Sequence, residues 1–286
     1  MSELQSFGFG FGYVALGIVA LLIAKVIKDV ATPFGINEEL TVKDNPAIGV
    51  VLAGYFIGVT IIFLGAVIGP DFQETPTMME VATMMATDFT YAMGGVIALL
   101  IGRIVLDKVV LTSFSVTKEI IEDRNCGTAA VECGNMIATA LVVAGAIHGE
   151  GGGPATAVAF FALGQLALVV FGWLYKTIVK YDVHAEIEKD NVAAGVALGC
   201  NLVAFAIIVL RGISGDMISW ESNLLWFGIY VVSGATILMF LRKVADALFL
   251  PNTTIAHEIA NDQNMNAAWI EGAIATSVAS IIFFVL

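Results

Sequence analysis

The sequence predicts an all-α integral membrane protein whose eight transmembrane helices form a tandem repeat of two four-helix units. The first observation is composition: 58% of the 286 residues are hydrophobic and 13% are charged, whereas soluble domains carry about 25% charged residues. The second is a series of eight apolar runs, each near the ~20 residues that a bilayer core requires. The third is a polar motif that occurs twice with the same internal spacing.

The repeated motif reads KEIIEDRN at residues 118–125 and HEIANDQN at residues 257–264. Both copies share a Glu, an Ile, an Asp and an Asn at the same spacing, and each leads into an apolar run. A second glutamate, Glu132 or Glu271, then follows about two helical turns inside that run. This recurrence indicates duplication.

In the first half, the opening apolar run should remain in the protein as a helix. Residues 1–5 lack the basic start of a cleavable signal peptide. The second run opens at Asn45-Pro46, where proline occupies the first helical turn at no cost, and it stops before Gly69-Pro70. The predicted spans of this half are residues 8–28, 45–68, 81–101 and 126–147.

A glycine-rich linker at residues 149–154 divides the chain. We therefore expect a first four-helix repeat at residues 1–148 and a second at residues 155–286. The second half repeats the order of runs and polar segments seen in the first. Its predicted spans are residues 155–175, 191–210, 223–241 and 265–286.

The basic residues predict the orientation. Of the 13 Lys and Arg residues, 12 lie in the segments that join spans 1–2, 3–4, 5–6 and 7–8 or, for Lys25 and Lys28, at the end of the span that leads into them, and only Arg211 lies on the other side. The positive-inside rule places those segments in the cytoplasm, with both termini on the outer, periplasmic side. Because each half has an even number of spans, the halves should be parallel rather than inverted.

The start of the second span carries a family resemblance. Asp44, Asn45, Pro46 and Ala47, together with the four-helix unit, resemble the YjfL-type family of bacterial inner-membrane proteins (domain of unknown function 350). The second copy keeps Asp190, Asn191 and Ala193, but has Val192 in place of the proline. The resemblance covers the chain as two fused copies. It implies a multi-pass protein of the bacterial cell inner membrane and supplies no activity.

Glu132 and Glu271 are the first candidates for chemistry. An ionised carboxylate at this depth costs of order 2.5–3.5 kcal/mol, so it must be protonated, paired or hydrated. One interpretation is a proton or cation site at equivalent places in the two halves. The other is a glutamate that fastens neighbouring helices, with Asn135 or a backbone carbonyl as its partner.

Further polar residues lie inside the predicted spans. Asp88, about two turns into span three, is either a second carboxylate on an ion path or a hydrated interfacial group. Amides in membranes more often hydrogen-bond across helices than contact a substrate. The three intramembrane amides are Asn135, Gln165 and Asn201.

Two Arg-Asp pairs with a spacing of four residues end spans three and seven. They are Arg103 with Asp107 and Arg242 with Asp246. We interpret them as interfacial pairs whose basic side chains extend to the membrane surface. The alternative is a cytoplasmic docking surface.

Each even-numbered span begins at an Asp/Asn cluster. Asn and Asp are preferred N-caps because their side chains accept hydrogen bonds from free backbone amides. The residues are Asp44, Asn45, Asp123, Asn125, Asp190, Asn191, Asp262 and Asn264. They predict helix caps on the cytoplasmic side, and the neighbouring acids disfavour an anion site there.

Several classes of function are not expected. The net charge of −12 argues against nucleic acid as a partner. The three cysteines and three histidines show no metal-ligand spacing, and a glycine-rich phosphate loop is missing. We predict no cofactor, no metal site and no catalytic residues, and hence no enzyme.

Two functional hypotheses remain. The first is a transporter or channel-like protein that handles protons or cations at Glu132 and Glu271. The alternative is a non-transporting envelope scaffold that oligomerises and recruits cytosolic partners through its polar connectors. In either case the lipid bilayer is a partner, and we expect a homo-oligomer or a membrane complex. Small-residue motifs suit close helix contacts inside a bundle or at an oligomer seam; they are Gly54-x-x-x-Gly58, Gly195-x-x-x-Gly199 and Ala268-x-x-x-Gly272.

Overall fold

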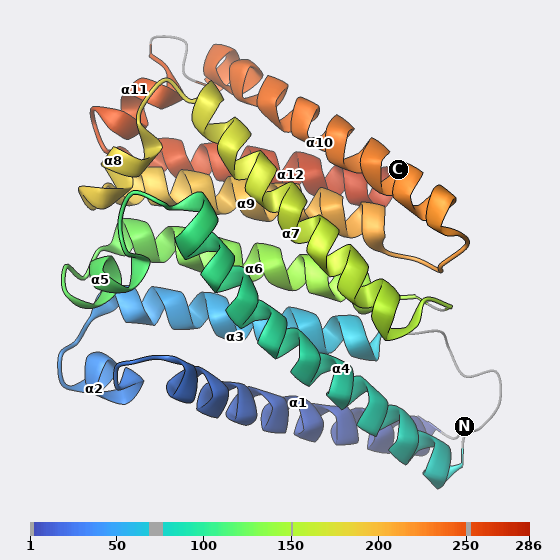
Figure 1. The fold of residues 1–286 in the computed structure, drawn as a ribbon. Helices are drawn as coiled ribbons and strands as arrows, with labels where there is room; N and C mark the ends of the chain where they lie inside the picture. The colour runs from blue at the N-terminus through green and yellow to red at the C-terminus, as the bar shows by residue number, and fades with distance from the viewer. Residues whose placement is uncertain (1–2, 69–76, 150, 250–252) are drawn as a thin grey trace.

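A computed structural model describes residues 3–68, 77–149, 151–249 and 253–286. These residues form helices and connecting segments, with no strand among them (Figure 1). The long helices are α1 (Glu3–Ala31), α3 (Pro46–Val67), α4 (Met78–Val105), α6 (Cys126–Ile147), α7 (Gly153–Ile178), α9 (Val192–Ile213), α10 (Trp220–Phe249) and α12 (Met265–Val285). The short ones are α2 (Ile36–Thr41), the π-helical turn η1 (Leu106–Val110), α5 (Val116–Ile121), α8 (Val183–Glu188) and α11 (Ile255–Ala260).

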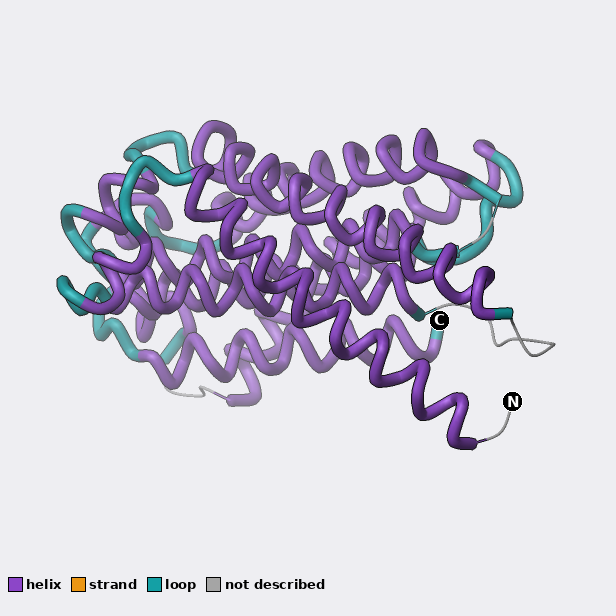
Figure 2. The backbone as a smooth tube through the Cα atoms, turned by 90° about the horizontal axis from the view of Figure 1, so that it is seen from below, coloured by secondary structure: helices purple, strands orange, loops and turns teal. Residues whose placement is uncertain are grey.

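The chain is built from four copies of one hairpin, each with a long helix, a short helix and a second long helix. Figures 1 and 2 place α2, α5, α8 and α11 together at one end of the molecule, which we call the connector end. Both chain termini lie at the opposite end (Figure 1). Eight of the described helices are long and apolar enough to cross a membrane. The predicted all-α membrane fold with a tandem repeat is therefore confirmed.

The long helices form two layers. The second helices of the hairpins, α3, α6, α9 and α12, pack side by side in an inner row (Figure 1). In the other layer, α4 contacts both α3 and α6, α7 contacts α6 and α9, and α10 contacts α9 and α12. Helix α1 packs on α3 and α4. The inner row is thus a repeating series, and each outer helix after α1 covers one of its grooves.

Small residues allow the inner row to pack closely. At each joint a side chain added to the glycine would collide with the facing helix. The three contacts are Gly54 with Cys133, Gly134 with Gly199, and Gly272 with Cys200. Of the two interpretations of the small-residue motifs, these glycines follow the one that placed them inside the bundle.

The inner helices begin at asparagine N-caps. The side-chain oxygens of Asn45, Asn125, Asn191 and Asn264 accept hydrogen bonds from amides in the first helical turn. We call these four residues the cap asparagines. None of the aspartates of the same clusters caps the helix that it precedes, so that part of the prediction is wrong, although Oδ1 of Asp190 accepts a hydrogen bond from the amide of Gly127 in the first turn of α6, at 3.1 Å.

Those aspartates have other roles at the turn. Asp44 and Asp190 directly precede the cap and adopt φ values of 49° and 60°, in the left-handed region that aspartate tolerates. Asp123 and Asp262 lie one residue earlier. The turn that reverses the chain therefore needs a left-handed residue before the asparagine.

Two features of the helices differ from the prediction. The polar connectors contain short helices, three of which are capped by side chains of Ser115, Asp182 and Thr254. The helix predicted to end at residue 101 runs to Val105 and continues as η1, and the helix predicted to end at residue 241 runs to Phe249. Arg103 had marked a polar edge in the sequence, but its charge is neutralised within the bundle, so the helix does not need to end there.

Candidate functional site: two buried charge centres

The first charge centre surrounds Glu132 on α6, whose side chain is fully buried. Its Oε1 lies 2.9 Å from Nε of Arg103 on α4 and 3.5 Å from Nζ of Lys28 on α1. Nη2 of Arg103 also donates to Oγ1 of Thr117, at 2.9 Å. Three long helices therefore meet at one carboxylate, and two cations share its charge.

Neighbouring groups close this centre. Nζ of Lys28 lies 5.1 Å from the ring centroid of Tyr55, within cation–π range, and the Tyr55 hydroxyl donates to the carbonyl of Ala24 at 2.8 Å. A cavity lined by Lys28, Arg103 and Glu132 has a volume of about 10 Å³, close to the smallest space that holds one water. The first centre thus has room for about one water molecule.

The second charge centre surrounds Glu271 on α12, with 4% of its side chain exposed. Its Oε1 accepts a hydrogen bond from Nη1 of Arg242 on α10 and one from the Asn201 amide on α9, at 3.1 Å. The Tyr175 hydroxyl on α7 lies 3.4 Å from the same oxygen and accepts from Arg242 at 3.1 Å. Here one cation, Arg242, and two neutral groups, the Asn201 amide and the Tyr175 hydroxyl, contact the carboxylate.

The two centres share an arginine–glutamate pair, which lies in the second hairpin (α4 to α6) and again in the fourth (α10 to α12). In both, the arginine precedes its glutamate by 29 residues. The predicted Arg103–Asp107 and Arg242–Asp246 pairs are therefore wrong, because each arginine turns inward to a glutamate. Asp107 and Asp246 instead accept hydrogen bonds from the first backbone amides of the next short helices, at Val116 and Ile255. Their arginines are not available as a docking surface.

The glutamates are paired, although not with the predicted partner. The Asn135 amide donates to the backbone carbonyl of Gly102, at 3.2 Å. Gln165 donates to Thr139 at 3.3 Å. Of the three intramembrane amides, Asn201 is therefore the one that contacts a glutamate. These amides bond across helices or, for Asn201, also to its own helix at Ala197.

Asp88 lies apart from both centres. Its Oδ2 accepts a hydrogen bond from the Tyr13 hydroxyl at 2.8 Å, which links α4 to α1. Along α4 it is fifteen residues from Arg103, or about 22 Å at 1.5 Å per residue. The structure therefore does not bring Asp88 together with the two glutamates.

Sequence reasoning missed four members of the centres, namely Lys28, Tyr55, Thr117 and Tyr175. Lys28 had a visible signal, since it is a cation at the end of an apolar run, one helical turn after Lys25. The equal spacing of Arg103–Glu132 and Arg242–Glu271 was also present in the sequence, but the nearer aspartates obscured it. Nothing in the sequence distinguishes the two tyrosines from ordinary interfacial aromatic residues.

The connector end holds a second polar network, formed by the cap asparagines. The amide of Asn45 donates to Glu39 in its own hairpin at 3.2 Å and to the carbonyl of Ile120 in the next hairpin at 2.9 Å. Asn125 and Asn191 make the same two kinds of bond. Their partners are Glu119 and Ile187 for Asn125, and Glu186 and Ile259 for Asn191. The network ties each hairpin to the following one.

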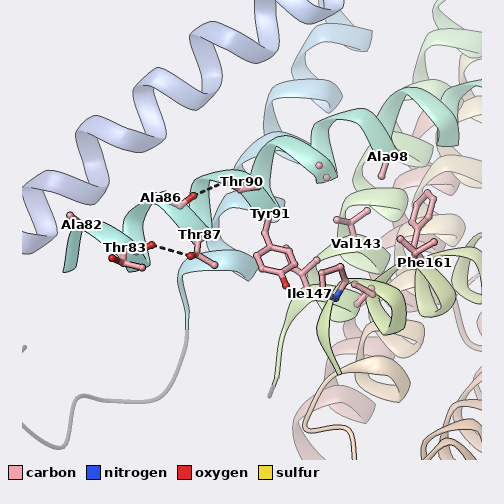
Figure 3. Close-up of a pocket in the computed structure, with 16 residues that line it drawn as sticks. Ala82, Thr83, Ala86, Thr87, Thr90, Tyr91, Ala98, Val143, Ile147 and Phe161 are labelled. Carbon is pink, nitrogen blue, oxygen red and sulfur yellow. Dashed lines mark hydrogen bonds between the residues drawn. The ribbon is translucent and has the colours of Figure 1, made fainter. Parts of the chain in front are cut away.

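A large apolar crevice lies between α4 and α7 (Figure 3). Its volume is about 810 Å³, and its lining includes Tyr91, Val143 and Phe161. The hydroxyls of Thr83, Thr87 and Thr90, which also line it, donate to carbonyls of their own helix. The lining therefore suits hydrocarbon chains rather than a hydrated ion.

Comparison with known proteins agrees with this architecture. A family model described as Domain of Unknown Function (DUF350) matches twice, over residues 2–147 and 151–286. A UPF0719 transmembrane protein of Aquifex aeolicus (strain VF5) is 21% identical over 249 residues, which cover 86% of this chain and 87% of the relative. No solved structure matches.

Proposed function

This chain belongs to the DUF350 family of membrane proteins, and from that premise we propose that it is a non-transporting, non-catalytic scaffold of the bacterial inner membrane. The supporting observation is the pairing of both buried intramembrane glutamates with arginines. In this role the charge centres are structural braces. They hold α1, α4 and α6 together in the first half, and α7, α9, α10 and α12 in the second.

The energetics favour a brace over a binding site. An isolated charge in the membrane is costly, and removing one partner of a buried ion pair costs about 3–5 kcal/mol. Once formed, the Arg103–Glu132 and Arg242–Glu271 pairs resist separation. A transported ion would have to displace a cation already bound to each carboxylate.

The connector end supplies the surface for partners in this proposal. Lys118, Glu122, Asp123 and Arg124 are exposed around α5, beside the buried network of the cap asparagines. Because almost all Lys and Arg residues of the chain lie toward this side rather than the other, the positive-inside rule orients it to the cytoplasm. Both termini then face the periplasm. A rigid hydrogen-bonded platform with a mixed charged surface suits recruitment of a cytosolic protein.

Ion flux into proteoliposomes tests the scaffold function. The wild-type protein, Glu132→Gln and Glu271→Gln are reconstituted separately, and proton and monovalent cation fluxes are recorded under an imposed gradient. We expect all three to match protein-free liposomes. A wild-type flux that disappears in folded Gln variants would overturn the proposal.

The second candidate is a proton or cation transporter, and one observation favours it. Oε2 of Glu132 and Oε2 of Glu271 are buried without a hydrogen-bond partner among the described residues. A free carboxylate oxygen in each half is what an exchangeable proton would require. The same flux measurement separates this candidate from the scaffold.

A further inference from the structure

The four hairpins are joined by one rule that operates three times. At the connector end, each of the first three cap asparagines donates to a carbonyl of the following hairpin. That carbonyl always belongs to the residue directly after the glutamate that bonds the next cap asparagine. The three accepting residues are Ile120, Ile187 and Ile259.

The same rule extends along the inner row. The ninth residue after one cap asparagine meets the eighth residue after the next. This holds for Gly54 with Cys133, for Gly134 with Gly199, and for Cys200 with Gly272. The hairpins are therefore related by a nearly constant step, and a constant step has no built-in end.

Both ends of the series are left incomplete. The amide nitrogen of Asn264 donates to Glu258 at 2.7 Å, and the described residues provide it with no carbonyl of a following hairpin. At the other end, Leu40 directly follows Glu39. Its carbonyl is therefore equivalent to the carbonyls of Ile120, Ile187 and Ile259, which accept hydrogen bonds in the later hairpins. A donor at one edge thus matches an acceptor position at the opposite edge.

The helix faces at the two edges match as well. The ninth residue after Asn264 is Ala273, and the eighth after Asn45 is Ala53. Both are small and exposed. Each internal joint contains a glycine, so two alanines need a slightly wider spacing between α12 of one copy and α3 of the next. Gly49, one turn before Ala53, also has open space around it, whereas the equivalent Gly195 packs on Gly127.

Burial falls at the edges of the row. In the most apolar stretch of each inner helix, 67% of residues are buried in α6 and 78% in α9, against 56% in α3 and 28% in α12. Helix α1, which contacts one inner helix, has 11% buried, and α10, which contacts two, has 17%. A further inner helix beside α3 would complete the groove that α1 covers.

We propose that copies of this chain join edge to edge in the membrane, with α12 of one copy packed against α3 of the next. The joint would repeat the internal rule, with Ala273 against Ala53 and Asn264 donating to the carbonyl of Leu40. This inference deepens the proposed scaffold function and rests on it. The contact is head-to-tail, so copies build a closed ring or an open row, depending on the rotation at each joint.

One residue distinguishes the joint between copies from the internal joints. Trp269, 56% exposed, is the fifth residue after Asn264, where α6 has Ala130 and α9 has Val196. In the internal joint between α6 and α9, the equivalent Ala130 lies against Gly199, the eighth residue after its cap asparagine, so Trp269 would lie beside Ala53 of the neighbouring copy. Tryptophan is enriched among residues that dominate interface energies, which suits an anchor between separate chains.

Paired cysteines test the joint in native membranes. Ala53→Cys and Ala273→Cys are placed on two differently tagged copies of the otherwise unchanged chain, and the membranes are oxidised. We expect a disulfide-linked dimer carrying both tags. Each variant expressed alone should give no dimer, because a head-to-tail contact does not bring a residue to its own equivalent.

The controls fix the meaning of each outcome. The wild-type chain, with its own three cysteines, and Val232→Cys on the exposed face of α10 should remain monomeric on the gel. Self-linking of either single variant, adducts with other proteins, or no link at all in folded chains would overturn the inference. The last result is expected if lipid covers both faces. Flux does not enter the readout, so failure here is distinguishable from failure of the scaffold function.

A second variant tests the same joint without oxidation. Ala53→Trp fills the exposed face of α3 with a bulky side chain and leaves the interior of the chain untouched. In nanodiscs or mild detergent, we expect the mass to fall from a multiple of the chain to that of one copy. Val232→Trp is the matched control and should leave the mass unchanged. An unaltered mass in both variants would contradict the proposed contact.

Discussion

The two charge centres have equivalent glutamates and arginines at equivalent places in their hairpins. They differ in the further side chains that contact the glutamate. In the first centre, Lys28 from α1 adds a second cation to Glu132. In the second, the hydroxyl of Tyr175 from α7 and the amide of Asn201 take part instead. The formal charge of the ionised side chains is therefore +1 in the first centre and zero in the second.

This difference shows which part of the site the fold depends on. Helix α1 and helix α7 occupy equivalent places in the two repeats, but one supplies a cation and the other a phenol. The arginine–glutamate pair of each even hairpin is the shared element. The partner from the first or third hairpin varies, being Lys28 on α1 or Tyr175 on α7. The two centres therefore differ in charge although their helices pack alike.

The largest effect should come from removing Glu132. The substitution Glu132→Gln leaves Arg103 and Lys28 buried without a counter-charge, whereas Glu271→Gln leaves only Arg242. We expect Glu132→Gln to cost at least ~3–5 kcal/mol of unfolding free energy, more than Glu271→Gln. Thermal unfolding in detergent, followed by loss of helical signal, measures both. Equal losses would show that Lys28 does not depend on Glu132.

The arginines should show the opposite order. Arg103→Met leaves Lys28 to balance Glu132, but Arg242→Met leaves Glu271 with an amide and a phenol only. We expect Arg242→Met to destabilise by about 3 kcal/mol and Arg103→Met by roughly half of that. The same unfolding assay applies. A larger loss for Arg103→Met would contradict the sharing of charge in the first centre.

Double substitutions sharpen the comparison further. Replacing both members of a buried ion pair by apolar residues is often nearly neutral. The double variant Arg242→Met/Glu271→Leu should therefore recover most of the stability lost in Arg242→Met. The matched variant Arg103→Met/Glu132→Leu should not recover, because Lys28 stays charged and unpaired until Lys28→Met is added. If Arg103→Met/Glu132→Leu recovered its stability without Lys28→Met, the proposed difference in charge between the two centres would be contradicted.

The smallest effect concerns pH at the connectors, where Glu39 and Glu119 hold equivalent positions. The hydrogen bond from Lys43 lowers the pKa of Glu39, so its contribution to stability is lost as the pH falls through its folded pKa. Burial raises the pKa of Glu119, so its contribution is present at low pH and is lost as the pH rises through its folded pKa.

The two glutamine variants test these opposite signs. From about pH 3 to 7, the melting-temperature advantage of the wild type over Glu39→Gln should grow, and its advantage over Glu119→Gln should shrink. Slopes of the same sign would contradict the opposite shifts. The pair is matched because each carboxylate accepts a hydrogen bond from its own cap asparagine, Asn45 or Asn125.

Local patterns in the sequence were enough to predict the eight spans, the tandem repeat and the cap asparagines. Apolar run length and an asparagine before each inner helix are signals carried by adjacent residues. The partners of Glu132 could not be derived in this way. Lys28 is 104 residues from Glu132, and only the packing of α1 on α3 and α4 brings the two together. Arg103 was assigned to Asp107 because nearness in sequence outweighed the matched spacing of the two arginine–glutamate pairs.

The separation of Lys28 from Glu132 bears on how the protein is made. Arg242 and Glu271 belong to one hairpin, so they can enter the bilayer together already paired. Lys28 emerges from the ribosome 104 residues before its carboxylate and must keep its ammonium group near the headgroups in the meantime. The first helix therefore reaches its final contacts only after the fourth span has been synthesised.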